Sequence, residues 1–547
     1  MKRRLVLVFC VLSFLTRIQA QDAVPPPNTA TLAGTVVKEP GSQPLKKVLL
    51  HLIAEDQKQG GNYTADTDSE GHFRIEKIQP GRYRLLLEKT GFHQINLRGH
   101  QAEGSILSVQ PGQESNDLLF QMLPAAVITG KVVDEDGEPL PGYGVSLLRK
   151  RSGKSREPEG AGNERTNDLG EYRFGGLFPG QYLVAVIPLP DTRNFEHLAK
   201  ESDGTASKQY LNYLVTYYPG TTDSAQAAAI SLRAGEEMPV NFTMFPGRTY
   251  RVRGIVTGVP ANQKPLVQVI SKGVNNTMNA AEVAPDGQFE VRGIAPGSYT
   301  ITVFSGSEGT FLTARESVTV VAADVEGLKL VPVRPFTVSG HLRIEGWTSK
   351  HATDFTASLR PAPDVDDNGM SISVEGWNAQ VDRFGNFQWT NVTPGNYVAS
   401  VYLDQSSDSF LKSVTVGNSP ADTGFSVSGP TTIELVIGFG AGMLDGVVLD
   451  HDKPTSNATV VAVPEEKYRK LHDRYAIGAA DQNGRFTIHG LAAGSYTVYA
   501  WQDLDEGLYY DPAFLKSQES NGVALKIEQG SRQKIELKLA TVSDDWQ

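Results

Sequence analysis

The sequence predicts an all-β protein built as a tandem array of five Greek-key β-sandwich modules. Three observations predict this fold: one turn-and-strand signature recurs five times, alternating apolar residues follow each copy, and no long amphipathic helical pattern occurs. The length of 547 residues also exceeds what one hydrophobic core holds, so several units of about 100 to 150 residues are expected.

Each copy of the signature reads Gly-x-(Phe/Tyr), then an aliphatic residue seven positions after the glycine, then (Pro/Ala)-Gly-x-Tyr starting nine positions after it. We expect the first glycine to adopt positive φ in a hairpin turn, the aromatic residue to begin a strand, and the second glycine to turn the chain before the tyrosine. The copies contain these first glycines and final tyrosines: Gly71 and Tyr83, Gly170 and Tyr182, Gly287 and Tyr299, Gly385 and Tyr397, and Gly484 and Tyr496.

The repeated tyrosine allows two interpretations, a sugar-stacking ring or a structural corner. A tyrosine at a Greek-key corner buries its ring and returns its hydroxyl to nearby backbone, and the same-parity positions that follow each tyrosine are mostly apolar. We therefore predict that all five tyrosines are structural. Trp389, which shares the parity of Phe387, is expected in the core as well.

The copies divide the chain into modules at 29–126, 127–247, 248–335, 336–440 and 441–547, after a linker at 21–28. The first glycines are 99, 117, 98 and 99 residues apart, and the longer interval indicates an insertion at 190–220 in the second module. We expect a short helix at 194–201 within it. Insertions in a repeat array often lie on one face and can carry a binding function, although loops also vary without consequence.

Residues 1–20 have the charged, apolar and small-residue order of a secretory signal peptide. The single cysteine, Cys10, lies inside it, so we expect no disulfide and no cysteine-ligated metal in the mature chain. Four basic residues and no acidic one leave with the signal, which changes the formal charge from −11 to −15. This acidic, thiol-free chain without a transmembrane segment argues against nucleic acid as a partner. We predict a periplasmic or extracellular protein, with association with the outer membrane through a partner as an alternative.

The second copy carries Gly130-Lys131-Val132-Val133-Asp134, then Asp168-Leu169-Gly170-Glu171-Tyr172-Arg173-Phe174, then Pro179-Gly180-Gln181-Tyr182. These residues resemble the bacterial carboxypeptidase-regulatory-like domain, a transthyretin-like sandwich that overlaps the carbohydrate-binding-like fold group. The resemblance extends through all five copies and is looser in the third, where Ala284 replaces an aspartate. It implies an accessory β-sandwich without catalysis of its own, often found in exported and envelope-associated bacterial proteins, and it makes polysaccharide the first candidate ligand.

The pattern predicts no enzyme, no catalytic residue and no cofactor. A zinc carboxypeptidase would need a His-x-x-Glu pair, a distant third histidine and an α/β domain to hold them. The chain offers one such tetrapeptide, from His100 to Glu103, in a loop between strands. We interpret it as a coincidence because it lacks that scaffold.

One acidic loop fits the spacing of a calcium site. Asp364, Asp366 and Asn368 occupy alternate positions, and Glu375 stands where such loops place a bidentate carboxylate. The alternative is an acidic hairpin tip that is merely solvated, because the flanking residues have the pattern of strands.

Aromatic residues in the loops of the fourth and fifth modules are candidates for glycan binding. Trp501 lies on the opposite parity from the core positions of its strand and could be exposed beside Tyr509 and Tyr510, while Trp377 and Trp347 lie near loops. The alternative is burial under a neighbouring loop or at a module junction.

The leading functional hypothesis is an exported binding or scaffold protein of the bacterial envelope whose ligand is a polysaccharide or another envelope protein. A structural or accessory subunit that binds another exported protein is the alternative. A hydrolase is a third class, for which the sequence shows no catalytic constellation. The oligomeric state stays open.

Overall fold

The computed structural model describes residues 29–55, 60–95, 104–150, 158–188, 195–200, 206–271, 278–306, 312–346, 351–362, 377–402, 408–502, 504, 505, 507–543 and 546. For residues 195–200 and 206–210 it describes the backbone alone. The predicted signal peptide and linker lie outside the described residues.

In this part of the chain, the strands form ten sheets, and each of five buried apolar clusters contains residues from two of them. The predicted all-β sandwich fold is therefore confirmed. We keep the word module for each pair of sheets; the residue boundaries given above stay a prediction.

Module 1 pairs a sheet of β1 (Ala30–Lys38), β2 (Gln43–Pro44), β5 (His72–Ile78), β7 (Phe92–Gln94) and β9 (Glu114–Pro124) with a sheet of β3 (Leu49–Ala54), β4 (Tyr63–Asp66), β6 (Gly81–Glu88) and β8 (Ser105–Val109). Module 2 pairs β10 (Ala126–Val133), β13 (Glu171–Leu177), β19 (Glu237–Pro239) and β20 (Phe242–Thr243) with β11 (Gly144–Arg149), β12 (Glu159–Arg165), β14 (Gly180–Ile187), β17 (Thr216–Tyr217) and β18 (Ile230–Leu232), and holds the 3-10 turn η1 (Ser224–Gln226).

Module 3 pairs β15 (Phe195–Lys200), β16 (Ala206–Tyr213), β21 (Pro246–Val256), β24 (Gln288–Ile294) and β27 (Val325–Leu330) with β22 (Leu266–Ser271), β23 (Met278–Glu282), β25 (Gly297–Ser305) and β26 (Leu312–Val320). Module 4 pairs β28 (Phe336–Glu345), β31 (Asn386–Val392), β33 (Ser409–Val416), β34 (Ser419–Pro420) and β36 (Thr431–Phe439) with β29 (Thr356–Pro361), β30 (Trp377–Gln380), β32 (Gly395–Tyr402) and β35 (Phe425–Val427), and holds η2 (Ala352–Asp354).

Module 5 pairs β37 (Gly442–Asp450), β38 (Lys453–Pro454), β41 (Arg485–Leu491) and β44 (Arg532–Lys538) with β39 (Thr459–Pro464), β40 (Ala476–Ala479), β42 (Gly494–Trp501) and β43 (Val523–Ile527). Its turns η3 (Glu466–Tyr468), η4 (His472–Arg474), η5 (Leu508–Tyr510) and η6 (Glu519–Asn521) and the helix α1 (Pro512–Ser517) lie between these strands in sequence.

Every module repeats one strand pairing. One strand that precedes the signature in sequence, which we call the first strand, lies between two partners. The antiparallel partner starts directly after the signature glycine, and the parallel partner lies near the end of the module, as β1 lies between β5 and β9. Strands β10, β21, β28 and β37 have the same two kinds of neighbour.

A glycine within each first strand makes this close packing possible. A Cβ on Gly130 would lie 1.8 Å from the Val240 carbonyl oxygen, and one on Gly340 would lie 2.0 Å from the Phe387 ring. Real Cβ atoms do not approach other atoms so closely, so the glycine lets the last strand and the signature aromatic residue pack against the first strand.

The signature glycines make the predicted turns. Their φ angles are all positive, from 74° at Gly484 to 88° at Gly385. Four of these turns are closed by a side chain three residues before the glycine. In module 1, for example, the Asp68 carboxylate accepts the backbone N–H groups of Glu70 and His72, both at 2.9 Å. Those backbone hydrogen bonds to His72 and Glu70 hold the pKa of Asp68 below its usual range.

The signature tyrosines are corners, as predicted. All five rings are buried, and each hydroxyl donates to the carbonyl oxygen four residues earlier, at distances from 2.6 Å for Tyr83 to 3.1 Å for Tyr496. Burial is the largest cause that raises the pKa of Tyr299, to about 12, so its hydroxyl stays a donor at neutral pH.

Replacing Tyr397 with phenylalanine should lower the free energy of unfolding of module 4 by about 1 kcal/mol, because the Thr393 carbonyl loses its donor. Guanidinium unfolding of the full chain, followed by tryptophan fluorescence, measures this. The matched control is Tyr402→Phe in the same module, since Tyr402 is 69% exposed. Equal stability of Y397F and Y402F would contradict the corner role.

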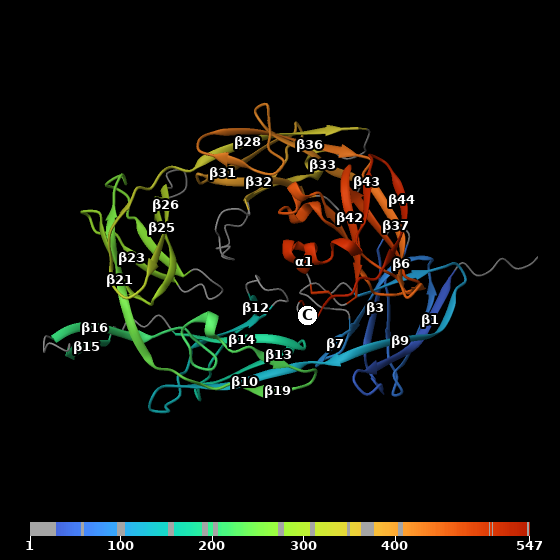
Figure 1. The fold of residues 1–547 in the computed structure, drawn as a ribbon, viewed down its shortest axis with the longest axis horizontal. Helices are drawn as coiled ribbons and strands as arrows, with labels where there is room; N and C mark the ends of the chain where they lie inside the picture. The colour runs from blue at the N-terminus through green and yellow to red at the C-terminus, as the bar shows by residue number, and fades with distance from the viewer. Residues whose placement is uncertain are drawn as a thin grey trace, which may run out of the picture.

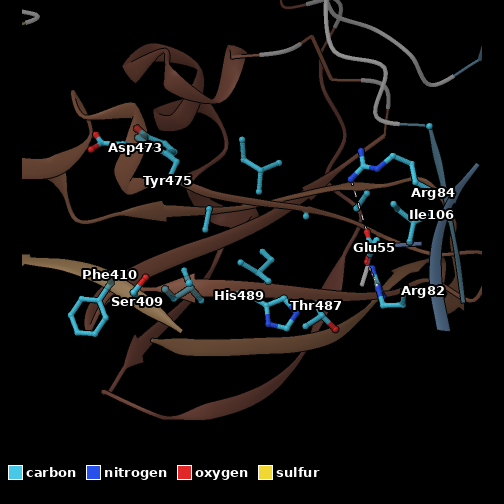
Figure 2. Close-up of a pocket in the computed structure, with 18 of the residues that line it drawn as sticks. Glu55, Arg82, Arg84, Ile106, Ser409, Phe410, Asp473, Tyr475, Thr487 and His489 are labelled. Atoms are coloured by element: carbon cyan, nitrogen blue, oxygen red, sulfur yellow. Dashed lines mark hydrogen bonds and ion pairs between the residues drawn. The ribbon is translucent and has the colours of Figure 1, made fainter. Parts of the chain in front are cut away.

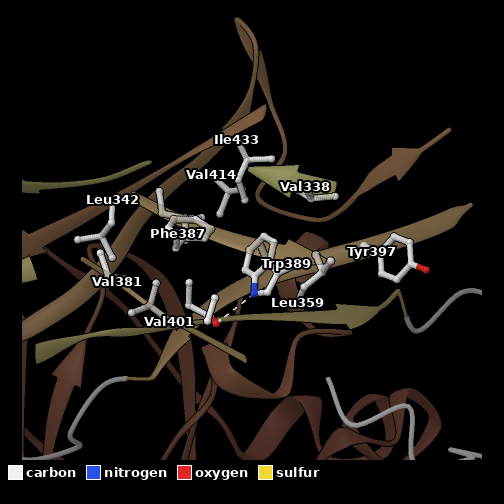
Figure 3. Close-up of a cluster of buried hydrophobic side chains, with 14 of the residues drawn as sticks. Val338, Leu342, Leu359, Val381, Phe387, Trp389, Tyr397, Val401, Val414 and Ile433 are labelled. Atoms are coloured by element: carbon white, nitrogen blue, oxygen red, sulfur yellow. Dashed lines mark hydrogen bonds between the residues drawn. The ribbon is translucent and has the colours of Figure 1, made fainter. Parts of the chain in front are cut away.

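The core of module 4 shows how the sandwich is filled (Figure 3). Trp389 is 1% exposed, its ring centroid lies 4.8 Å from that of Phe387, and its indole N–H donates to the Ala357 carbonyl oxygen at 3.2 Å. The predicted core position of Trp389 is confirmed, because both its apolar surface and its one polar group are accommodated.

The predicted helix at 194–201 is wrong. Strands β15 and β16 form a hairpin there, and β16 continues the module 3 sheet by pairing with β21. The edge of β21 presents unpaired backbone groups, and a strand satisfies them where a helix would not. The insertion of the second module thus extends the sheet of the third.

The five modules follow one another around a ring, so that the first and the last lie side by side (Figure 1). Direct hydrogen bonds join them: residues of β8 in module 1 contact residues 481 and 482 in module 5. This closure brings together side chains that are about 370 residues apart in sequence.

Candidate functional site

A cleft between modules 1, 4 and 5 is the candidate site (Figure 2). Its volume is about 1720 Å³. Module 1 contributes β6 and β8, module 4 contributes β29, β32 and β33, and module 5 contributes η4, β40 and β41. A site of this kind exists only when the ring is closed.

Ser108 joins module 1 to module 5. Its backbone N–H donates to the Gln482 side-chain oxygen at 2.9 Å, and its carbonyl accepts from the Gln482 amide at 2.7 Å. Its hydroxyl donates to Asp481 Oδ2 at 2.6 Å, while Asp481 Oδ1 accepts the N–H groups of its own turn. Asp481 is 1% exposed. We call this contact among Ser108, Asp481 and Gln482 the latch.

Two contacts between modules 4 and 5 form the opposite wall of the cleft. The Arg474 guanidinium donates to the Leu411 carbonyl oxygen at 3.0 Å, and Arg360 lies 3.7 Å from the Asp473 carboxylate. Among the described residues, polar contacts join module 5 to modules 1 and 4, and the apolar core cluster of each module contains residues of that module alone.

Charged groups from different walls face the cleft (Figure 2). Glu55 pairs with Arg82 at 2.9 Å and lies 4.0 Å from Arg84. His489 lies on the module 5 side; partial burial and the nearby positive charge of Arg82 lower its pKa. Its imidazole is thus held toward the neutral form, which both donates and accepts hydrogen bonds.

Aromatic rings form another part of the lining. Tyr402 is 69% exposed, and His472 stacks on Tyr510 with centroids 3.8 Å apart and planes 11° from parallel. Tyr475 packs edge-on against Tyr510 at 4.7 Å, and burial raises its pKa. These rings present flat apolar faces, and the buried Tyr475 stays protonated.

For Trp501 and Tyr509 the alternative of burial under a neighbouring segment is confirmed, so neither ring is exposed for glycan binding. Trp501 is 0% exposed and Tyr509 is 5% exposed, in a second apolar cluster of module 5. Helix α1 covers them: Phe514 packs on Trp501 at 5.6 Å, and Gln518 accepts the Trp501 indole N–H at 3.2 Å. Opposite parity placed Trp501 outside the sandwich, but the segment after β42 folds back over that face.

The other predicted aromatic residues have different positions. Tyr510 is half-buried and lines the cleft, so of this group it is the one that the structure brings to the site. Trp377 is half-buried, with its ring 5.6 Å from that of Tyr397 at the edge of the module 4 core. Trp347 lies outside the described residues.

The predicted calcium loop, with Asp364, Asp366, Asn368 and Glu375, also lies outside the described residues and stays a prediction. Among the side chains that are described, no group of three histidines or carboxylates is placed to hold a metal ion. Across the same residues, no helix has the length and apolar character needed to span a membrane.

Most of the cleft was not foreseen from sequence. Arg82, Arg84, Arg360 and His489 stand at outward positions of ordinary strands, and no local motif marks them. Only the way in which the modules meet brings them together.

Two stretches of the chain, residues 31–122 and 127–199, match the carboxypeptidase regulatory-like domain. The predicted resemblance is confirmed for these residues. No curated protein matches the chain.

Several solved structures are similar. A streptococcal ancillary pilin is 14% identical, with 56% of this chain and 99% of that chain covered and a TM-score of 0.19. A minor pilin of Streptococcus agalactiae is 16% identical, covering 40% and 95%, with a TM-score of 0.20. The TIE protein of Bacillus anthracis is 11% identical, covering 56% and 51%, with a TM-score of 0.17, so this chain spans about half of its length. Similarity at this level carries no information on function.

Proposed function

We propose that this chain is an exported, non-catalytic binding protein of the bacterial envelope that holds a carbohydrate in the cleft between modules 1, 4 and 5. The observation that carries the proposal is the lining of that cleft, which combines an exposed tyrosine, a stacked histidine–tyrosine pair and four arginines. Ring faces bind the apolar faces of sugars, and side-chain donors bind their hydroxyls.

The carboxylates of the cleft support binding rather than hydrolysis. A glycosidase needs two carboxyl groups that flank the scissile bond. Here Glu55 lies against Arg82 and Arg84, and Asp473 faces Arg360, so each carboxylate has a cationic neighbour. The described lining of the cleft therefore supplies no acid and base pair.

The second candidate, a structural subunit that binds another exported protein, is favoured by the hairpin of β15 and β16. In the sheet order β15-β16-β21-β24, β15 is the edge strand. An edge strand offers backbone hydrogen bonds to an added strand from a partner. Binding of an exported protein that survives all changes in the cleft would favour this function.

Replacing Tyr402 with alanine should weaken glycan binding about five- to tenfold, because the most exposed ring face of the cleft is lost. A glycan array with the full mature chain identifies a ligand, and calorimetric titration measures the change. The matched control is Phe384→Ala, since Phe384 is 65% exposed in the same module and outside the cleft. No binding to any glycan, or an equal loss of affinity in Y402A and F384A, would contradict the proposed site.

A further inference from the structure

The cleft has a positive charge excess in an acidic protein. Its lining contains four arginines and two carboxylates among the described residues, whereas the whole chain has a formal net charge of −11. The arginines are Arg82, Arg84, Arg360 and Arg474. A concave site lined by one sign of charge concentrates ligands of the opposite sign.

These cations come from three modules and therefore surround the cleft. Arg82 and Arg84 lie on module 1, Arg360 on module 4 and Arg474 on module 5. The lowered pKa of His489, to which Arg82 contributes after burial, is consistent with a positive potential on the module 5 side as well.

Arg360 is the arginine best placed to meet a ligand. Arg474 already donates to the Leu411 carbonyl oxygen, and Arg82 has a short ion pair with Glu55 at 2.9 Å. By contrast, Arg360 lies 3.7 Å from the Asp473 carboxylate, and its side chain is 49% exposed. A guanidinium at such a distance can turn to a carboxylate of a ligand and bind it with two parallel hydrogen bonds.

We propose that the ligand of this cleft is an acidic oligosaccharide, in which a uronic-acid carboxylate binds to Arg360 while sugar rings lie against Tyr402 and Tyr510. This inference rests on the proposed function and names the class of its ligand. An acidic peptide would use the arginines but has no need of the flat ring faces, so the combination favours a charged sugar.

The test compares acidic probes with neutral counterparts of the same length on the full mature chain. Titration calorimetry uses hexagalacturonate, its methyl ester, a mannuronate hexamer, a hyaluronan hexamer and cellohexaose. We expect at least one acidic probe to bind about tenfold more tightly than the neutral probes, and added salt to reduce that difference.

Arg360→Gln should weaken binding of the acidic probe about tenfold and leave binding of the neutral probes unchanged. The matched control is Arg383→Gln, which removes one positive charge from an exposed turn outside the cleft. A loss in R383Q equal to that in R360Q would show a long-range charge effect and overturn the assignment.

The remaining outcomes separate the inference from the proposed function. If a neutral probe binds and no acidic probe binds more tightly, the acidic class is overturned while carbohydrate binding stands. Binding of an acidic peptide, without any acidic sugar, overturns both the class and the carbohydrate proposal. If no probe binds, acidic or neutral, both the acidic class and the carbohydrate proposal are overturned.

Discussion

Trp501→Ala should destabilise module 5 by about 3–5 kcal/mol, the cost typical of removing a large buried aromatic side chain. The ring is 0% exposed and lies between Tyr499, at 5.0 Å, and Phe514, at 5.6 Å. The change would also leave Gln518 without the indole donor that it accepts at 3.2 Å. We expect helix α1 to lose its packing against β42.

Thermal unfolding of the full chain measures this effect. The transition of module 5 should fall by well over 10 °C, since about 1 kcal/mol corresponds to about 4–8 °C in a domain of this size. Trp377→Ala is the control, because Trp377 is half-buried at the edge of its core and should cost less. If W501A keeps the stability of the parent chain and loses glycan binding instead, Trp501 contacts ligand and its burial is not the native state.

Trp501 also shows where prediction from sequence stops. Parity along a strand tells which side chains face the interior of a sandwich, and it placed Trp389 correctly because both faces of that interior belong to one module. It could not tell that the segment with α1 would cover the outer face of β42, where Trp501 lies. An outward position is exposed only when no other part of the chain packs on it.

The cleft illustrates the same limit at a larger scale. The five-fold signature predicts turns, corners and cores, because each depends on residues within about 20 positions of one another, and the glycine turns and tyrosine corners confirm it. Arg84 and Arg360 line one cleft only because modules 1 and 5 are joined, and that contact depends on Asp481 and Gln482 in a turn and Ser108 in a strand. The sequence marks Tyr510 by its aromatic ring and does not indicate which residues surround it.

The double variant Ser108→Ala, Gln482→Ala should open the ring. It removes the charge-assisted bond of the Ser108 hydroxyl to Asp481 and both bonds of the Gln482 amide to the Ser108 backbone. A loss of about 3 kcal/mol from these bonds would reduce the ratio of closed to open molecules about a hundredfold. It leaves Asp481 Oδ1 to close its own turn, so module 5 should still fold.

Small-angle X-ray scattering of the full chain distinguishes the two states. We expect a larger radius of gyration and a longer maximum dimension for the double variant, with unchanged circular dichroism. The matched control is Asp168→Ala, which alters the same turn position in module 2, where no contact with another module is made through that side chain in the described structure. The closed shape should persist in D168A.

The latch variant also tests whether the cleft depends on closure. Arg82 and Arg84 belong to module 1 and the stacked pair of His472 and Tyr510 to module 5, so an open ring separates these two arginines from the rings. Binding of the acidic probe should then fall at least tenfold, although every residue that lines the cleft keeps its identity apart from Ser108. Unchanged scattering together with weakened binding would mean that Ser108 itself contacts the ligand. Opened scattering with full binding would mean that one module carries the site alone.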